Sequence, residues 1–219
     1  MKVRFFTFIV LLVFISIVPA GTARAGQRGL VGKGVKIGFG YAGLRGYDTY
    51  DWEPRVTFAA GAFADVRVMS FLAFQPELIY NCKGAEITLG GELTEYGYRE
   101  SRIKIKLQYL ELALLVKLLP STPKDIEVFQ FVPKIVLGPV FGKNISAERV
   151  EYGPAEDYDN VVNDNEFGLI IGGGLDNYIG GGCYITFDFR FQYSFTKAVE
   201  KTGTGLYNKQ FIFLLGFSF

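Results

Sequence analysis

Seven charged residues share one face of the strands that the sequence predicts, and their types could support acid–base chemistry. They are Asp65, Arg67, Glu77, Glu111, Lys117, Asp188 and Arg190. Two carboxylates beside an arginine could act as general acid and base. However, the chain contains no histidine, which excludes Ser-His mechanisms and most zinc sites. We therefore predict a structural or pore-lining charge network without a catalytic residue, metal or cofactor, because charges taken from water into a narrow lumen must pair.

Two segments between the predicted strands contain candidate binding residues. Tyr47, Tyr50 and Trp52 could bind a partner or a glycan through their aromatic faces, although an interfacial aromatic belt explains them nearly as well. The acidic segment 148–166 contains Asp157 and Asp159 and fits no EF-hand spacing, which favours a solvated loop. These five residues are our candidates for binding by loops.

The stretch 38–43 matches the pattern G-x-G-x-x-G of dinucleotide-binding sites. No helical pattern follows it and no βαβ unit surrounds it. We interpret its glycines as inward-facing residues of the first strand.

Alternation of apolar and polar residues predicts one all-β domain with eight strands. They lie near residues 35–42, 55–68, 71–82, 102–118, 128–143, 165–177, 183–195 and 207–219. In the seventh segment Phe187, Phe189 and Phe191 alternate with Asp188 and Arg190, so one face is apolar and the other is charged. Closed bacterial barrels have an even number of strands. The predicted fold is an eight-stranded, antiparallel, up-and-down transmembrane β-barrel.

The glycines indicate which face points inward. Gly38, Gly61, Gly138 and Gly174 share the face that carries the charges, and small residues mixed with long charged ones fill a narrow lumen. The opposite face is rich in Phe, Leu, Ile and Val, as in the segment 211–219, where Phe or Leu occupies every second position. We therefore predict a polar interior and a lipid-facing exterior.

The fourth segment departs from simple alternation. Ile105, Leu107 and Tyr109 share one parity, whereas Leu110 and Leu112 share the other. A β-bulge near Tyr109 and Leu110 would keep both sets on the lipid-facing side. We predict this bulge, because without it half of the strand would turn its apolar side chains into the lumen.

The predicted connections alternate in length. Long polar joins lie at about 43–54, 83–101, 144–164 and 196–206, and shorter ones near 69–70, 119–127 and 178–182. Outer-membrane barrels have long extracellular loops and short periplasmic turns. This pattern predicts that both termini lie in the periplasm.

The start of the chain resembles a secretory signal peptide. Lys2 and Arg4 precede an apolar run over 5–18, and small residues lead to Ala23 and Ala25. We predict a signal peptide over 1–25 and a barrel domain over 26–219.

The overall charge is nearly balanced, with 23 Lys and Arg against 22 Asp and Glu. The sequence therefore has no basic footprint for nucleic acid. Cys82 and Cys183 fall at opposite ends of the predicted barrel, so we expect both to be unpaired.

Two segments resemble a known family. The stretches LAFQPELIYNCKG (72–84) and LQYLELALLVK (107–117) are similar to the third and fourth strands of outer-membrane β-barrel proteins of the PorT-like family, found in Bacteroidetes-type bacteria. Relatives usually have Pro where this chain has Ala113. The resemblance implies an eight-stranded outer-membrane barrel and little about function.

We expect a monomeric, non-enzymatic barrel with a side-chain-plugged lumen, which acts through its outer loops, in an envelope or secretion assembly. Its expected partners are outer-membrane lipid, an envelope protein, and the barrel-assembly machinery through the C-terminal strand ending at Phe219. Two alternatives stay open. One is a narrow channel or carrier for small solutes, and the other is a soluble lipocalin-like binder with an apolar interior.

Overall fold

The computed structural model describes seven stretches of the chain. They are residues 29–46, 52–94, 97–119, 130–150, 156–157, 162–201 and 204–219. The predicted signal peptide lies outside them. No helix in these stretches is long and apolar enough to cross a membrane.

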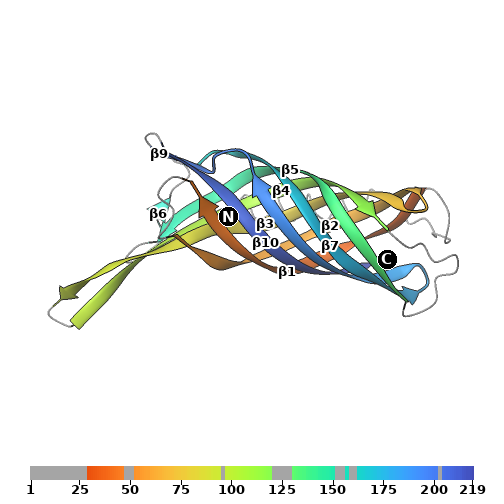
Figure 1. Cartoon of the computed structure of the whole chain (residues 1–219), viewed down its shortest axis with the longest axis horizontal. Coiled ribbons are helices and arrows are strands. Elements are labelled where there is room, and N and C mark those ends of the chain that lie inside the picture. Colours follow the sequence, from red (N-terminus) through yellow and green to blue (C-terminus); the bar gives the residue numbers. More distant parts are fainter. Residues whose placement is uncertain are drawn as a thin grey trace.

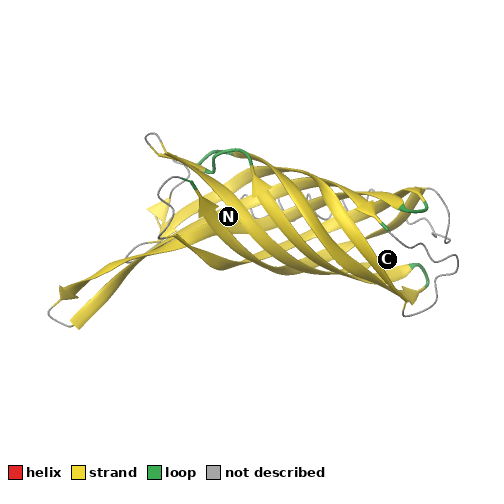
Figure 2. Cartoon of the chain, viewed as in Figure 1, coloured by secondary structure: helices red, strands yellow, loops and turns green. Residues whose placement is uncertain are grey.

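Eight long strands form the wall of a barrel (Figures 1 and 2). They are β1 (Gly29–Arg45), β2 (Trp52–Met69), β3 (Leu72–Thr94), β4 (Gly97–Leu118), β5 (Gln130–Val150), β7 (Asn165–Gly180), β8 (Cys183–Ser194) and β10 (Thr204–Ser218). Each pairs antiparallel with the next, and β1 pairs with β10 from Gly34↔Ser218 to Arg45↔Tyr207. This last pairing closes the barrel. Two short strands, β6 (Glu156–Asp157) and β9 (Val199–Lys201), pair with β5 and β10.

The two ends of the barrel differ. We call "turn end" the end with the tight turns at 70–71 and 181–182 and the last residue of β10; it lies at the right of Figure 1. The φ angles of Gly180, Gly181 and Gly182 are 98°, 62° and 83°, a left-handed region that glycine enters without a Cβ clash. The opposite "loop end" carries the hairpin of β3 and β4, which projects well beyond the other strands at the left of Figure 1.

The eight predicted strands are confirmed, but several extend further than alternation indicated. The largest difference is the predicted loop 83–101. The β3–β4 ladder instead continues to Thr94↔Gly97 with one register shift between Leu89 and Glu92. Polar residues at these positions do not end the strands, because a hairpin that projects beyond the bilayer can be polar on its surface.

The predicted orientation of the two faces is confirmed over most of the wall. On β8, Phe187 and Phe189 are 46% and 47% exposed, whereas Asp188 and Arg190 are 4% and 1% exposed. The same alternation recurs on β1, β5, β7 and β10. The soluble lipocalin-like alternative requires the reverse arrangement, so the structure contradicts it.

The predicted bulge in the fourth strand is wrong. The β3–β4 ladder stays in register through Tyr109 and Leu110, so Ile105, Leu107 and Tyr109 all point inward and are buried. The irregularity lies in the neighbouring strand, where Ile145 is skipped between the pairs Gln108↔Ser146 and Tyr109↔Asn144. The apolar inner side chains are stable there because loop residues enter the barrel mouth and cover them, as described below.

Cys82 and Cys183 are both unpaired, as predicted. Cys82 lies on β3 in the half of the barrel nearer the loop end, and Cys183 begins β8 at the turn end.

Candidate functional site: the barrel lumen

An ion network fills the turn-end half of the lumen. Alternation on seven strands directs four cations and four carboxylates inward, and all are buried. The cations are Lys36, Lys117, Lys134 and Arg190, and the carboxylates are Asp65, Glu77, Asp176 and Asp188. We call these eight residues the ion network. Its formal charge is 4 − 4 = 0, which meets the requirement that charges removed from water be compensated.

The first part of the network joins four strands near the turn end. Lys117 Nζ lies 2.6 Å from Asp65 Oδ2 and 2.7 Å from Asp176 Oδ2. The Tyr184 hydroxyl donates a further hydrogen bond to Asp65. Lys134 Nζ then connects Asp176 to the centre, at 2.8 Å from Asp176 Oδ1.

The second part lies at the centre of the lumen. Asp188 accepts contacts from three cations, with Lys134, Lys36 and Arg190 nitrogens at 2.6, 2.7 and 2.6 Å. Lys36 also lies 2.7 Å from Glu77, and both terminal nitrogens of Arg190 donate to the Glu77 carboxylate. This two-point guanidinium–carboxylate geometry is strong and directional. The network therefore links strands across the barrel.

A second cluster lies closer to the loop end and consists of Lys83, Glu111 and Glu166. Lys83 Nζ is 2.5 Å from Glu111 Oε1 and also pairs with Glu166. Buried amides surround this Lys83 cluster: Asn81 donates to Glu111 at 2.9 Å, and Gln192 donates to the other oxygen of Glu111 at 2.8 Å. Asn208 and Gln210 extend this hydrogen bonding onto β10.

Apolar side chains close the lumen at the loop end. They come from four barrel strands and from the segments before β7 and after β8, and we call them the apolar cap: Leu44, Ala85, Ile105, Leu107, Tyr109, Ala147, Val162, Ala198 and Val199. Val162 and Val199 form an isolated β-bridge, and Asn163 N donates to Ala198 O at 2.9 Å. The backbone of these connections is thus fixed across the mouth of the barrel.

Six of the seven predicted lumen residues form buried ion pairs. Arg67 is the exception: it lies half-buried near the turn end of β2, and its Nε has no hydrogen-bond partner among the described residues. Sequence reasoning missed Lys83, because it placed this residue in the loop 83–101, and Glu166, because it counted this residue with the acidic segment 148–166. The alternation along β3 could have identified Lys83, because it has the same parity as the inward-facing Glu77 and Asn81.

The predicted loop candidates are described only in part. Tyr47, Tyr50 and Asp159 lie outside the described residues. For Trp52 and Asp157 the structure gives the backbone alone, at the start of β2 and in β6, where Asp157 pairs with Glu148. The acidic segment is divided, because β5 continues to Val150 and β7 begins at Asn165.

The charged side chains in the lumen form ion pairs and hydrogen bonds with one another. The carboxylates are engaged by lysines, Arg190 or amides, an arrangement suited to joining strands and filling the interior. Among the residues that the structure describes, no group of three or more side chains is placed to hold a metal ion.

A family model described as "Outer membrane protein beta-barrel domain" matches residues 24–200. The chain belongs to this family, and membership implies an outer-membrane location. A comparison with curated proteins gave no match.

The structure is similar to several solved outer-membrane proteins at low sequence identity. Ail, the attachment invasion locus protein of Yersinia pestis, is 12% identical over 88% of this chain and 100% of its own, with a TM-score of 0.42. Neisserial surface protein A is 12% identical over 85% and 97%, with a TM-score of 0.48. OprG from Pseudomonas aeruginosa is 9% identical over 90% and 99%, with a TM-score of 0.47. Similarity at this level supports no inference about ligand or activity.

Proposed function

We propose that this protein is a non-enzymatic outer-membrane barrel that does not conduct solutes and acts through its loop end, as an interaction component of an envelope or secretion assembly. The observation that carries the proposal is the contrast between a lumen occupied by compensated charges under an apolar cap and a hairpin that projects from the same barrel. The two segments quoted above, 72–84 and 107–117, support placing it with PorT-like barrels.

Among the residues that the structure describes, no other strand pairs with the outer part of the hairpin, and we propose that these edges receive a partner. The β2–β3 ladder begins at Trp52↔Ile87, and the β4–β5 ladder ends at Lys104↔Val150. Beyond these pairs, the described residues of β3 and β4 pair only with each other, up to Thr94↔Gly97. The edge of a sheet can accept an additional strand from another protein.

The proposal places the turn end, and with it both termini, in the periplasm, and the hairpin outside the cell. Short turns on one side and longer connections on the other are typical of outer-membrane barrels. In this orientation the hairpin reaches an extracellular or surface-attached envelope partner, and the strand that ends at Phe219 is available to the assembly machinery.

Planar-bilayer recordings test the closed lumen. We expect no unitary current from the wild-type protein, because eight strands leave an interior that side chains fill. Stepwise currents that increase in Arg190→Ala or Glu111→Ala would contradict the proposal and identify a narrow channel or carrier.

Photo-crosslinking in the native cells tests the hairpin. A photoreactive residue at Thr88, on the projecting part of β3, should give a discrete adduct with an envelope protein. The matched control carries the same residue at Ser70 in the opposite turn and should not give that adduct. The same adduct from both positions, or none from Thr88, would contradict an interaction role for the hairpin.

A further inference from the structure

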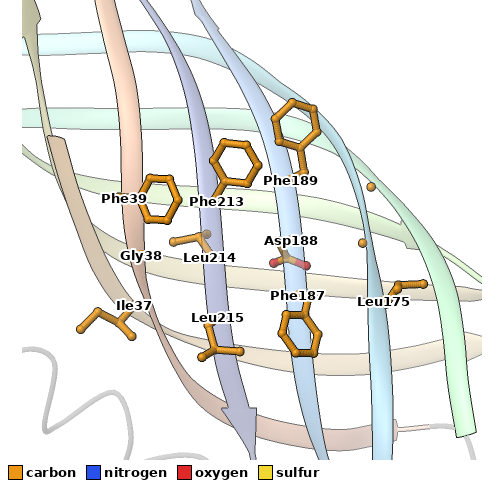
Figure 3. A pocket seen from close by; sticks show the side chains of 12 residues that line it. Ile37, Gly38, Phe39, Leu175, Phe187, Asp188, Phe189, Phe213, Leu214 and Leu215 are labelled. Atoms are coloured by element: carbon orange, nitrogen blue, oxygen red, sulfur yellow. The ribbon is translucent and has the colours of Figure 1, made fainter. Parts of the chain in front are cut away.

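A groove of about 710 Å³ crosses the outer surface of β7, β8, β10 and β1 (Figure 3). Aromatic rings form one wall, where Phe189 and Phe213 have centroids 4.8 Å apart and Phe213 and Phe39 stack at 5.2 Å. The other wall follows the next outward row of side chains: Leu175, Phe187, Leu215 and Ile37. The backbone between the two rows forms the floor.

The groove is wide at β7 because one outward position there carries no side chain. Along β7, Leu169, Ile171 and Leu175 point outward, and Gly173 occupies the outward position between the last two. Gly173 faces Phe189 on one side and Ile135 on the other. Any side chain at this position would extend into the groove.

Gly173 differs from Gly172 and Gly174 in the space that the backbone leaves for a Cβ atom. A Cβ on Gly172 or Gly174 would lie only 2.4 or 2.0 Å from a carbonyl oxygen of β8, so both must be glycine for the strands to pair. A Cβ on Gly173 would meet only the Lys134 carbonyl oxygen, at 3.3 Å. Backbone packing therefore does not require glycine at position 173. The main effect of this glycine is to leave apolar space open to the membrane.

We propose that the groove binds one acyl chain of a glycerophospholipid. It is continuous with the apolar exterior that family membership places in the bilayer, and hydrocarbon is the medium that surrounds such a surface. The side chains that line it include no Lys or Arg, whereas a phosphorylated lipid A headgroup is recognised by clustered cations. Rigid Phe rings restrict sideways movement of the chain.

The position of the groove along the barrel axis agrees with binding of a phospholipid acyl chain. Leu215 lies four residues before Phe219, and Phe187 lies four residues after Cys183. At about 3.3 Å per residue and a tilt of about 40°, this is roughly 10 Å from the turn end, within an apolar band about 25 Å tall. The aromatic wall lies two residues further along each strand, at Phe213 and Phe189, roughly 15 Å from the turn end. The groove therefore lies near the middle of the band, where the ends of acyl chains from the turn-end leaflet reach. That leaflet is the periplasmic, phospholipid leaflet if the orientation in the proposed function holds.

A second copy of the barrel fits the groove less well. Close association of membrane segments uses small residues that let two backbones approach. Here a single outward-facing glycine, Gly173, lies between Phe189 and Ile135. These bulky side chains would keep a neighbouring barrel at a distance while still admitting a chain of methylene groups.

Native mass spectrometry of the full protein in mild detergent, offered equal amounts of phosphatidylethanolamine and lipid A, tests the proposal. We expect a phosphatidylethanolamine adduct on the wild-type monomer that is lost in Gly173→Leu. The matched control Leu169→Phe adds bulk on the same face of β7 outside the groove and should keep the adduct. Phe213→Ala removes part of the aromatic wall without adding atoms and should weaken the phosphatidylethanolamine adduct. This second variant tests the proposal if Gly173→Leu does not give the heat-modifiable folded form.

Four outcomes would overturn the proposal: no lipid adduct on the wild type, an adduct unaffected by both Gly173→Leu and Phe213→Ala, a lipid A adduct instead, or a wild-type dimer that Gly173→Leu converts to monomer. The last would assign the groove to a second copy. None of these outcomes depends on conductance or on the hairpin, so they are distinct from a failure of the proposed function.

Discussion

β4 has opposite polarity in its two halves. From Leu110 to Leu118 it turns Leu112 and Val116 outward, and Glu111 and Lys117 inward. From Lys104 to Tyr109 the charged side chains are outside and Ile105 and Leu107 are inside. The register with β3 does not change between the halves and the parity of β4 is kept, so the medium outside the barrel explains the difference: hydrocarbon around one half and water around the other.

The comparison shows that one barrel combines two packing schemes. Around the ion network the exterior is apolar and the interior is charged, although small apolar clusters such as that of Leu115, Val136 and Ile170 also face the lumen. Around the apolar cap the interior is apolar, as in a water-soluble barrel, and outward charges pair across strands, as Lys104 does with Glu86 at 3.4 Å. Stability should therefore depend on buried ion pairs in one half and on apolar burial in the other.

The largest expected effect is that of removing Arg190. Arg190→Met leaves Glu77 and Asp188 with fewer cations in a buried site, and we expect a loss of about 3–5 kcal/mol in the free energy of unfolding, measured by urea titration in detergent micelles. Lys143→Met is the control, because its pair with Asp164 is largely exposed and should contribute less than about 1 kcal/mol. Equal losses from both substitutions would contradict a stabilising ion network.

A smaller effect is expected in the apolar cap. Leu107→Gln places an amide among apolar side chains, and we expect a loss of about 2–4 kcal/mol. The adjacent Lys106 points outward, so Lys106→Gln should change stability by less than about 0.5 kcal/mol. The same urea titration measures both. If Leu107→Gln is tolerated as well as Lys106→Gln, the side chain at 107 does not face the interior.

The smallest effect is expected for the outer pair of Lys104 and Glu86. Because Lys104 is 41% exposed at its side chain, Lys104→Gln should cost about 0.2–1 kcal/mol, and less at high salt. Repeating the urea titration at two ionic strengths measures this. A loss comparable to that of Arg190→Met would mean that this region is not in water.

The sequence predicted the part of the barrel where every outward side chain faces lipid and most inward side chains face the charged lumen. Phe187, Asp188 and Phe189 illustrate this, because their alternation continues through the whole width of an apolar band. The sequence could not predict at which residue of each strand the apolar band ends. Ile105 and Leu107 were assigned to the lipid face because apolar residues on a membrane strand normally face lipid, and no local pattern showed that Val162 and Val199 would cover them from the loops.

Lys83 and Glu166 escaped prediction for a related reason. The third predicted strand stopped at residue 82, before Lys83, and Glu166 was counted with the acidic segment 148–166, of the kind that usually forms a loop. Their pairing spans 83 positions of sequence, and only the closed barrel brings them together. Local alternation determines the face of a residue, whereas its partner depends on the tilt and register of all the strands.

The most direct test of the two packing schemes is spin-label accessibility along β4 in lipid vesicles, with Cys82 and Cys183 replaced by Ser. Labels at Lys104, Lys106, Leu112 and Val116 all point outward, and their collision rates with oxygen and with a water-soluble nickel chelate report the surrounding medium. We predict chelate access at 104 and 106 and oxygen access without chelate at 112 and 116. Lipid-like accessibility at all four positions would contradict the change of environment on which this account depends.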